Sequence, residues 1–234
     1  MTTLGIDGAR GGWFAVALHA DDTWGIGLHT RFEELMATYP DAAPALIDIP
    51  IGLPESGPRQ CDQEARRLLG PRGRSVFPVP CRGAVHAPDY ATACRRNERA
   101  LGRRLNRQTW NICPRIAEVD TFLRAHPEKI GILREAHPEL AFSALNRGRP
   151  MPHSKKTPEG LAERRAVLRT HLPAADAIFE EATACFRRKD LARDDILDAL
   201  VLAVAARGPL IAVPEEPETD TFGLPMEIAY PGLP

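Results

Sequence analysis

The pattern of hydrophobic and polar positions divides the first fifty residues into four short strands and one helix. Three β-rich stretches separated by turn residues predict strands at residues 3–7, 13–18 and 24–30. Apolar residues then recur at helical spacing over residues 32–39, which predicts a helix ended by a proline. A continuous apolar run over residues 45–49 predicts a buried strand.

The middle of the chain changes to helical spacing broken by glycine and proline. It predicts helices at residues 62–69, 90–105 and 114–124, with Pro114 in the first turn of the last one. Residues 71–88 are rich in proline and glycine and predict a loop.

The last hundred residues return to a mixed pattern. Strands are predicted at residues 130–137 and 210–213, and helices at 138–145, 159–170, 174–188 and 194–206. The succession of strands, helical excursion, strand and late helix predicts an α/β fold: a mixed sheet flanked by helices, with a helical insertion after the fourth strand. We expect a single domain over residues 1–213 with its insertion at about 55–128, and an acidic, proline-rich tail over 214–234 that is only partly ordered.

Composition narrows the class of protein. Hydrophobic residues make up 44% of the 234 residues and charged residues 26%, as in ordinary globular proteins. The longest apolar run, Ala199 to Ala206, is too short to span a bilayer, and the N-terminus has no signal-peptide pattern. The five cysteines form no C-x-x-C pair, which argues against a zinc site or a disulfide framework. We therefore expect a cytoplasmic protein without a membrane partner; its oligomeric state is left open.

The net charge of −1 conceals an uneven distribution of charge. Residues 59–115 contain thirteen arginines, no lysine and four acidic residues, a net charge of +9, whereas no basic residue follows Arg207. Such a segment is typical of a phosphate-binding surface, and nucleic acid is the expected partner. The candidate phosphate contacts are Arg66, Arg67, Arg72, Arg74, Arg82, Lys155 and Lys156. Two alternatives remain: solvated helix faces, or arginines paired with the acidic tail.

Acidic residues stand at the ends of predicted elements. Asp7 and Asp48 each close a strand, and Asp195 and Asp198 lie three residues apart at the start of the last helix. Glu135 and Glu139 flank His137. Separately these residues have simpler explanations, since an acid at a strand end can face solvent and acids in a first helical turn favour the helix dipole. His137 suits either a proton relay or a structural role.

Together the acids indicate one site. Carboxylates from two strand ends and a late helix can converge only if a cation relieves their repulsion, and Mg²⁺ or Mn²⁺ prefers such oxygen ligands. We expect Asp7, Asp48 and Asp198 to hold two such ions, as in metal-assisted phosphodiester cleavage, and Asp195 and Glu139 to complete the catalytic set.

Stretches of sequence along nearly the whole chain resemble one uncharacterised family. They include Gly5-Ile6-Asp7-Gly8-Ala9-Arg10-Gly11-Gly12-Trp13 and Asp48-Ile49-Pro50-Ile51-Gly52-Leu53-Pro54, and others lie at residues 59–66, 75–80, 108–120, 135–142, 154–157 and 194–199. They are similar to the domain-of-unknown-function four-twenty-nine family, which is described as predicted ribonuclease-H-like nucleases. The resemblance implies a ribonuclease-H-like fold and a metal-dependent nuclease.

The same superfamily also contains kinases and chaperone ATPases, whose first strand carries a similar Asp-x-Gly turn. A nucleotide- or phosphometabolite-binding protein that uses the same cleft is therefore the alternative function, and a non-catalytic scaffold is a third. Neither a second glycine-rich phosphate loop nor an adenosine pocket is evident in the sequence.

Overall fold

The computed structural model describes residues 1–232, which divide into two compact units. The first unit consists of Met1–Asp48, Gly131–Ile211 and the chain from Ala229 onward. The second consists of Ile49–Ile130 and Ala212–Ile228. It therefore contains the whole of the expected helical insertion together with most of the expected tail.

The first unit is built on a five-stranded sheet. Its strands are β1 (Thr2–Ala9), β2 (Gly12–His19), β3 (Trp24–His29), β4 (Ala42–Ile47) and β5 (Leu133–Glu135). Their order is β3-β2-β1-β4-β5, with β2 antiparallel to both β1 and β3, and with β1, β4 and β5 parallel. This mixed sheet, with a helical insertion after the fourth strand, has the ribonuclease-H-like arrangement, so the fold predicted from the sequence is confirmed.

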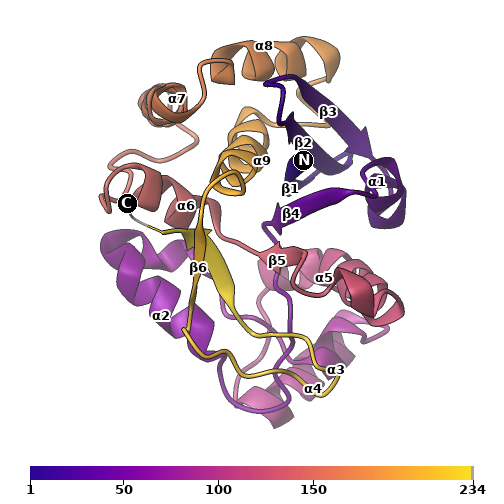
Figure 1. Cartoon of the computed structure of the whole chain (residues 1–234). Coiled ribbons are helices and arrows are strands. Elements are labelled where there is room, and N and C mark those ends of the chain that lie inside the picture. The colour runs from indigo at the N-terminus through magenta and orange to yellow at the C-terminus, as the bar shows by residue number, and fades with distance from the viewer. Residues whose placement is uncertain (233–234) are drawn as a thin grey trace. The chain divides into compact units, whose positions relative to one another are not determined.

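Helices cover both faces of this sheet (Figure 1). Helix α1 (Phe32–Thr38) packs on one face, where the ring of Phe32 meets that of Trp13 edge to face at 5.1 Å. The next residue of β2, Phe14, points to the opposite face and joins the main core. That core includes α6 (Pro138–Leu145), α7 (Pro158–His171), α8 (Ala175–Cys185) and α9 (Arg193–Ala205).

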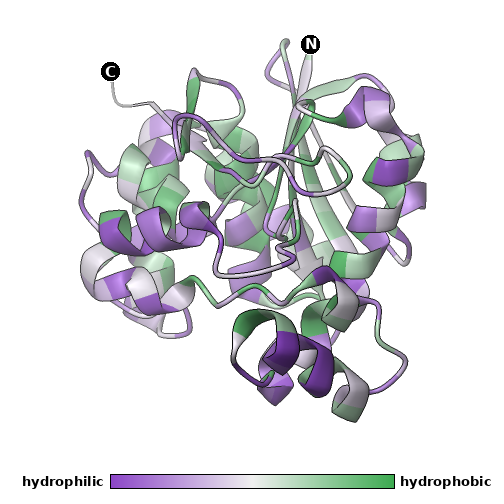
Figure 2. Ribbon diagram, turned by 90° about the horizontal axis from the view of Figure 1, so that it is seen from below, coloured by the Kyte–Doolittle hydropathy of each residue, from purple (hydrophilic) through white to green (hydrophobic). Residues whose placement is uncertain are grey.

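Helix α9 is the central element of this core, and ten consecutive residues from Ile196 to Ala205 are buried. The strands of the sheet are largely green in Figure 2, the colour of hydrophobic residues. The backbone of α9 lies directly against β1 at Gly5, where an added Cβ would come within 2.1 Å of the Ala199 carbonyl oxygen. Glycine at this position therefore permits a helix-to-strand approach that no other residue allows.

The second unit is helical and is held together by a buried ion-pair network. Its elements are α2 (Gln60–Leu69), η1 (Gly70–Ser75), α3 (Arg82–Val85), α4 (Tyr90–Leu101), α5 (Arg107–Ala125) and η2 (Pro127–Lys129). The buried guanidinium of Arg82 donates to both Asp120 and Asp220. Asp220 also accepts the backbone N–H groups of Leu53 at 3.0 Å and Leu224 at 3.1 Å. Asp220 and Leu224, in the segment after residue 212, are thus buried in the interior of this unit.

Three local predictions need correction. Pro114 lies inside α5 instead of opening it, because the helix begins at Arg107 after Asn106, whose side chain accepts the Thr109 N–H at 2.7 Å. The predicted loop at residues 71–88 contains most of η1 and all of α3. The tail forms a strand, β7 (Ile228–Pro231), which pairs with β6 (Leu210–Val213).

No helix within residues 1–232 has the length and hydrophobicity needed to cross a membrane.

Candidate functional site

Two of the predicted acids stand at the ends of neighbouring strands. Strands β1 and β4 are parallel, and Ile6 pairs with Ile47, so Asp7 and Asp48 follow in the next register position. The Asp48 N–H extends the ladder by donating to the Ile6 carbonyl at 3.0 Å. The Asp7 carboxylate turns back onto its own strand end and accepts the Gly8 N–H at 2.7 Å.

The third carboxylate comes from α9. Asp198 precedes Ala199, the residue that touches β1 at Gly5, so the close helix packing delivers this carboxylate to the strand ends. One carboxylate oxygen from each of Asp7, Asp48 and Asp198 lies within 4.8 Å of the other two. We refer to these three residues as the carboxylate triad. The convergence expected from the sequence is confirmed.

Burial and mutual repulsion make the triad costly to ionise. Desolvation, followed by the charges of Asp48 and Asp198, raises the pKa of Asp7 well above its ordinary value. Desolvation, together with the charge of Asp198, raises the pKa of Asp48 from 3.8 to about 7. The pKa of Asp198 is raised as well, again mainly by desolvation. A triad of this kind needs positive charge close to its oxygens at neutral pH.

Lys155 supplies one such charge. Its ammonium group donates to the Asp198 carboxylate, and the side chain is 34% exposed. Desolvation alone would lower the pKa of Lys155, but attraction to Asp198, Asp7 and Asp48 outweighs it and raises this pKa. Lys155 was expected to contact phosphate; the structure instead commits it to the triad.

The loop that carries Lys155 is fixed by buried contacts. Gly160 lets the loop lie against the first turn of α7, because a Cβ there would come within 1.9 Å of the Ser154 carbonyl oxygen. Arg164 is fully buried and donates to the His153 carbonyl at 3.1 Å and to the Gly160 carbonyl at 3.0 Å. These contacts therefore fix the loop, and with it the position of Lys155 beside the triad.

The other predicted acids lie around the triad in different roles. Glu139 binds the Arg164 guanidinium at 2.5 Å, while its charge helps to raise the pKa of Asp198. Asp195 accepts the Ala192 N–H at 3.2 Å and so caps α9, with desolvation chiefly raising its pKa to about 6. Glu135 is buried at the end of β5, and its charge contributes to the raised pKa of Asp48.

The two roles considered for His137 can now be compared with the structure. His137 is the N-cap residue of α6, and its carbonyl accepts the N–H groups of Leu140 at 2.9 Å and Ala141 at 3.0 Å.

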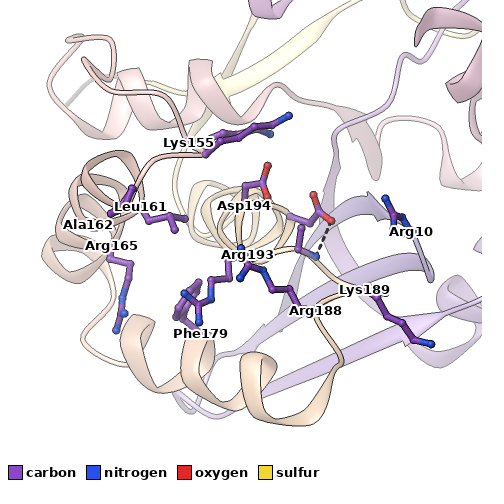
Figure 3. Close-up of a pocket in the computed structure, with 14 residues that line it drawn as sticks. Arg10, Lys155, Leu161, Ala162, Arg165, Phe179, Arg188, Lys189, Arg193 and Asp194 are labelled. Atoms are coloured by element: carbon purple, nitrogen blue, oxygen red, sulfur yellow. Dashed lines mark hydrogen bonds between the residues drawn. The ribbon is translucent and has the colours of Figure 1, made fainter. Parts of the chain in front are cut away.

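A cationic cleft of about 840 Å³ adjoins the triad within the first unit (Figure 3). Lys155 and Asp195 line it, so the cleft is continuous with the acidic site. Its cationic residues come from three loops and two helices: Arg10, Lys155, Lys156, Arg165, Arg188, Lys189 and Arg193. Among the described residues, two acidic ones, Asp194 and Asp195, line the same cleft.

The arginines of the basic segment lie elsewhere, in the second unit, and several of them are used internally. Arg82 is buried between Asp120 and Asp220, so the alternative considered from the sequence, pairing with the tail, holds for it. Arg66 is half-buried and donates to the Val76 carbonyl at 3.0 Å. Arg72 is half-buried, whereas Arg67 and Arg74 are exposed. A phosphate-binding role for these residues and for Lys156 stays a prediction.

The comparison with known protein families agrees with the motifs in the sequence. A family model described as "Protein of unknown function (DUF429)" matches residues 5–219. No curated protein and no solved structure matches the chain.

Proposed function

This chain belongs to the DUF429 family of proteins of unknown function, so its chemistry has to be argued from the site, and we propose that it is a metal-dependent nuclease that hydrolyses phosphodiester bonds. The observation that carries the proposal is the carboxylate triad, in which three oxygens from two strand ends and a core helix lie within 4.8 Å of one another. Its fit to a hard divalent cation is good, since all three donors are carboxylate oxygens.

The raised pKa values support the same interpretation. Three mutually repelling carboxylates, two of them buried and the third half-buried, destabilise the folded protein unless a bound cation offsets their repulsion. Mg²⁺ or Mn²⁺ held by Asp7, Asp48 and Asp198 would relieve that repulsion. When bound, such ions would activate a water and stabilise the leaving oxygen of a phosphodiester.

Other residues of the chain would support the triad in charge balance, positioning and substrate binding. Lys155 neutralises part of the charge on Asp198 and so limits how much positive charge the site must take up from solution. Asp195 and Glu139 hold the start of α9 and the Lys155 loop in place through their contacts with Ala192 and Arg164. The cationic cleft lies beside the triad, where it can bind the phosphates that flank the bond to be cleaved.

A cleavage assay tests the proposal directly. Wild type should cut single-stranded or double-stranded DNA or RNA in Mg²⁺ or Mn²⁺ and be inactive in EDTA. Asp7→Asn should lose activity, whereas Asp41→Asn, the same change at an exposed residue before β4, should retain it. If no substrate is cut, or if Asp7→Asn is as active as wild type, the nuclease proposal fails, and the nucleotide-binding alternative should then be tested with ATP and other phosphate compounds.

A further inference from the structure

The cationic cleft differs from an ordinary charged surface because its charges are left without partners. Within residues 1–232, no carboxylate pairs with any of five cations that line the cleft: Arg10, Lys156, Arg188, Lys189 and Arg193. The buried arginines of the second unit behave differently, since Arg59 binds Asp62 at 2.5 Å and Arg82 binds two aspartates. The cleft therefore has positive charge that no carboxylate within residues 1–232 neutralises. A ligand carrying several negative charges complements this charge.

The walls of the cleft are held together by contacts made away from the cations. The Gly11 N–H donates to the Asp190 carbonyl at 2.7 Å, which ties the turn carrying Arg10 to the loop carrying Arg188 and Lys189. Phe186, in the same loop, packs edge to face on Phe14 at 5.8 Å. The cations thus project from anchored backbone.

The cleft also combines apolar and cationic side chains. Leu161, Ala162 and Phe179 line it from α7 and α8, where the Arg165 guanidinium lies 4.7 Å over the Phe179 ring, and Arg10, Arg188 and Lys189 come from the two loops that the Gly11–Asp190 hydrogen bond joins. Apolar groups close to cationic ones suit a nucleotide unit whose unstacked base contacts the apolar groups and whose phosphates lie on the cations. Bases paired within a duplex are not available for such contact.

We propose that this cleft binds a single strand of nucleic acid, with its phosphates on Arg10, Arg188 and Lys189 and an unpaired base against Leu161 and Ala162. The inference rests on the proposed function, because it specifies the strand state of the nucleic acid that the triad would cleave. The binding is independent of base sequence, since the side chains of Leu161 and Ala162 offer no hydrogen-bonding group to read a base edge.

Binding can be measured without cleavage. Fluorescence anisotropy in EDTA, with a labelled 12-nucleotide single strand of mixed sequence and its duplex, should show the single strand bound at least tenfold more tightly. Three phosphate contacts on a single strand give a slope of about −2.1 for log K against log salt, since each contributes about −0.7. The Arg188→Ala/Lys189→Ala double variant should weaken affinity roughly tenfold or more and reduce the slope by about 1.4.

The matched control removes the same charge elsewhere in the first unit. Arg31 and Arg149 are exposed and do not line the cleft, so Arg31→Ala/Arg149→Ala should leave the salt slope unchanged. The inference is overturned if duplex binds as tightly as single strand, if the control reduces the slope as much as the cleft variant, or if neither probe binds.

The two proposals fail in different ways. A protein that binds a single strand through the cleft yet cuts nothing in Mg²⁺ or Mn²⁺ would refute the nuclease and leave the cleft inference intact. A protein that cuts nucleic acid, with the cleft variant binding and cutting like wild type, would refute the cleft inference alone.

Discussion

Replacing Asp48 by asparagine should stabilise the protein in the absence of metal. The substitution keeps the shape of the side chain and removes one charge from the triad. Asp48 is the cleanest choice, because Asp198 also holds Lys155 and Asp7 also accepts a backbone N–H. Asparagine at position 48 breaks no hydrogen bond of the described residues.

The size of the effect follows from the raised pKa of Asp48. In the unfolded chain this carboxyl loses its proton near pH 3.8, whereas in the folded protein it keeps the proton until about pH 7. The folded state therefore binds more protons between these values, so stability falls as the pH rises from 4 to 7 and the full cost is present above pH 7. A difference of this size corresponds to about 4 kcal/mol as an upper limit, and partial exposure of Asp48 reduces it to about 2–4 kcal/mol.

Thermal unfolding in EDTA across pH 4 to 8 tests this reasoning. Asp48→Asn should raise the Tm at pH 8 by about 5–15 °C and flatten the fall in Tm between pH 4 and 7. Millimolar Mn²⁺ should stabilise wild type, because it binds only the folded state, and should stabilise the variant much less. A variant that is less stable than wild type at pH 8, or that keeps the wild-type pH profile, would refute the argument that the ionised Asp48 carboxylate destabilises the folded protein.

Three further variants probe how the site is built. Gly5→Ala places a methyl group against the Ala199 carbonyl. The free energy of unfolding in urea should therefore fall by about 3 kcal/mol or more, and the stabilisation by Mn²⁺ should be lost. A variant as stable as wild type would mean that α9 can move away from β1. Lys155→Met keeps the apolar part of the side chain and removes the charge. In the absence of metal its Tm at pH 8 should fall by the equivalent of about 1–3 kcal/mol, while the stabilisation by Mn²⁺ increases. An unchanged Tm would mean that the ion pair contributes little to stability. Arg82→Met leaves Asp120 and Asp220 buried without their cation, so the free energy of unfolding in urea should fall by about 3–5 kcal/mol. If the variant instead binds nucleic acid less tightly and is as stable as wild type, Arg82 contacts phosphate.

The sheet and the triad could be predicted because their signals are local. Alternating or continuous apolar runs mark each strand, and Asp7 and Asp48 stand at the strand ends, so parallel pairing brings them together. Asp198 could be added because it lies near the start of an apolar helix that must lie in the core. The distance between Asp198 and the two strand-end aspartates could not be predicted. It depends on the packing of Gly5 against α9, a contact between residues nearly two hundred positions apart in the sequence.

The cationic cleft was harder to predict than the triad, because the density of charged residues along the sequence does not show which of them lie together in the fold. The thirteen arginines of residues 59–115 gave the strongest signal, yet Arg82 and Arg59 neutralise acids inside their own unit. The cations of the cleft, such as Arg10 and Arg193, are scattered over the sequence and meet only through the tertiary fold. One signal could have pointed to them: Arg187, Arg188 and Lys189 form a short basic run just before the acids of α9.

The role of Asp220 has a consequence for the order in which the chain folds during synthesis. The helical unit is mostly encoded between residues 49 and 130, but its buried Arg82 gains its second carboxylate only from a residue near the C-terminus. Until Asp220 has left the ribosome, Arg82 has only Asp120 in the interior, and the backbone N–H group of Leu53 lacks its acceptor. We expect the helical unit to complete its folding only after Asp220 has emerged, so ribosome-bound chains that end before residue 220 should remain sensitive to protease in this region.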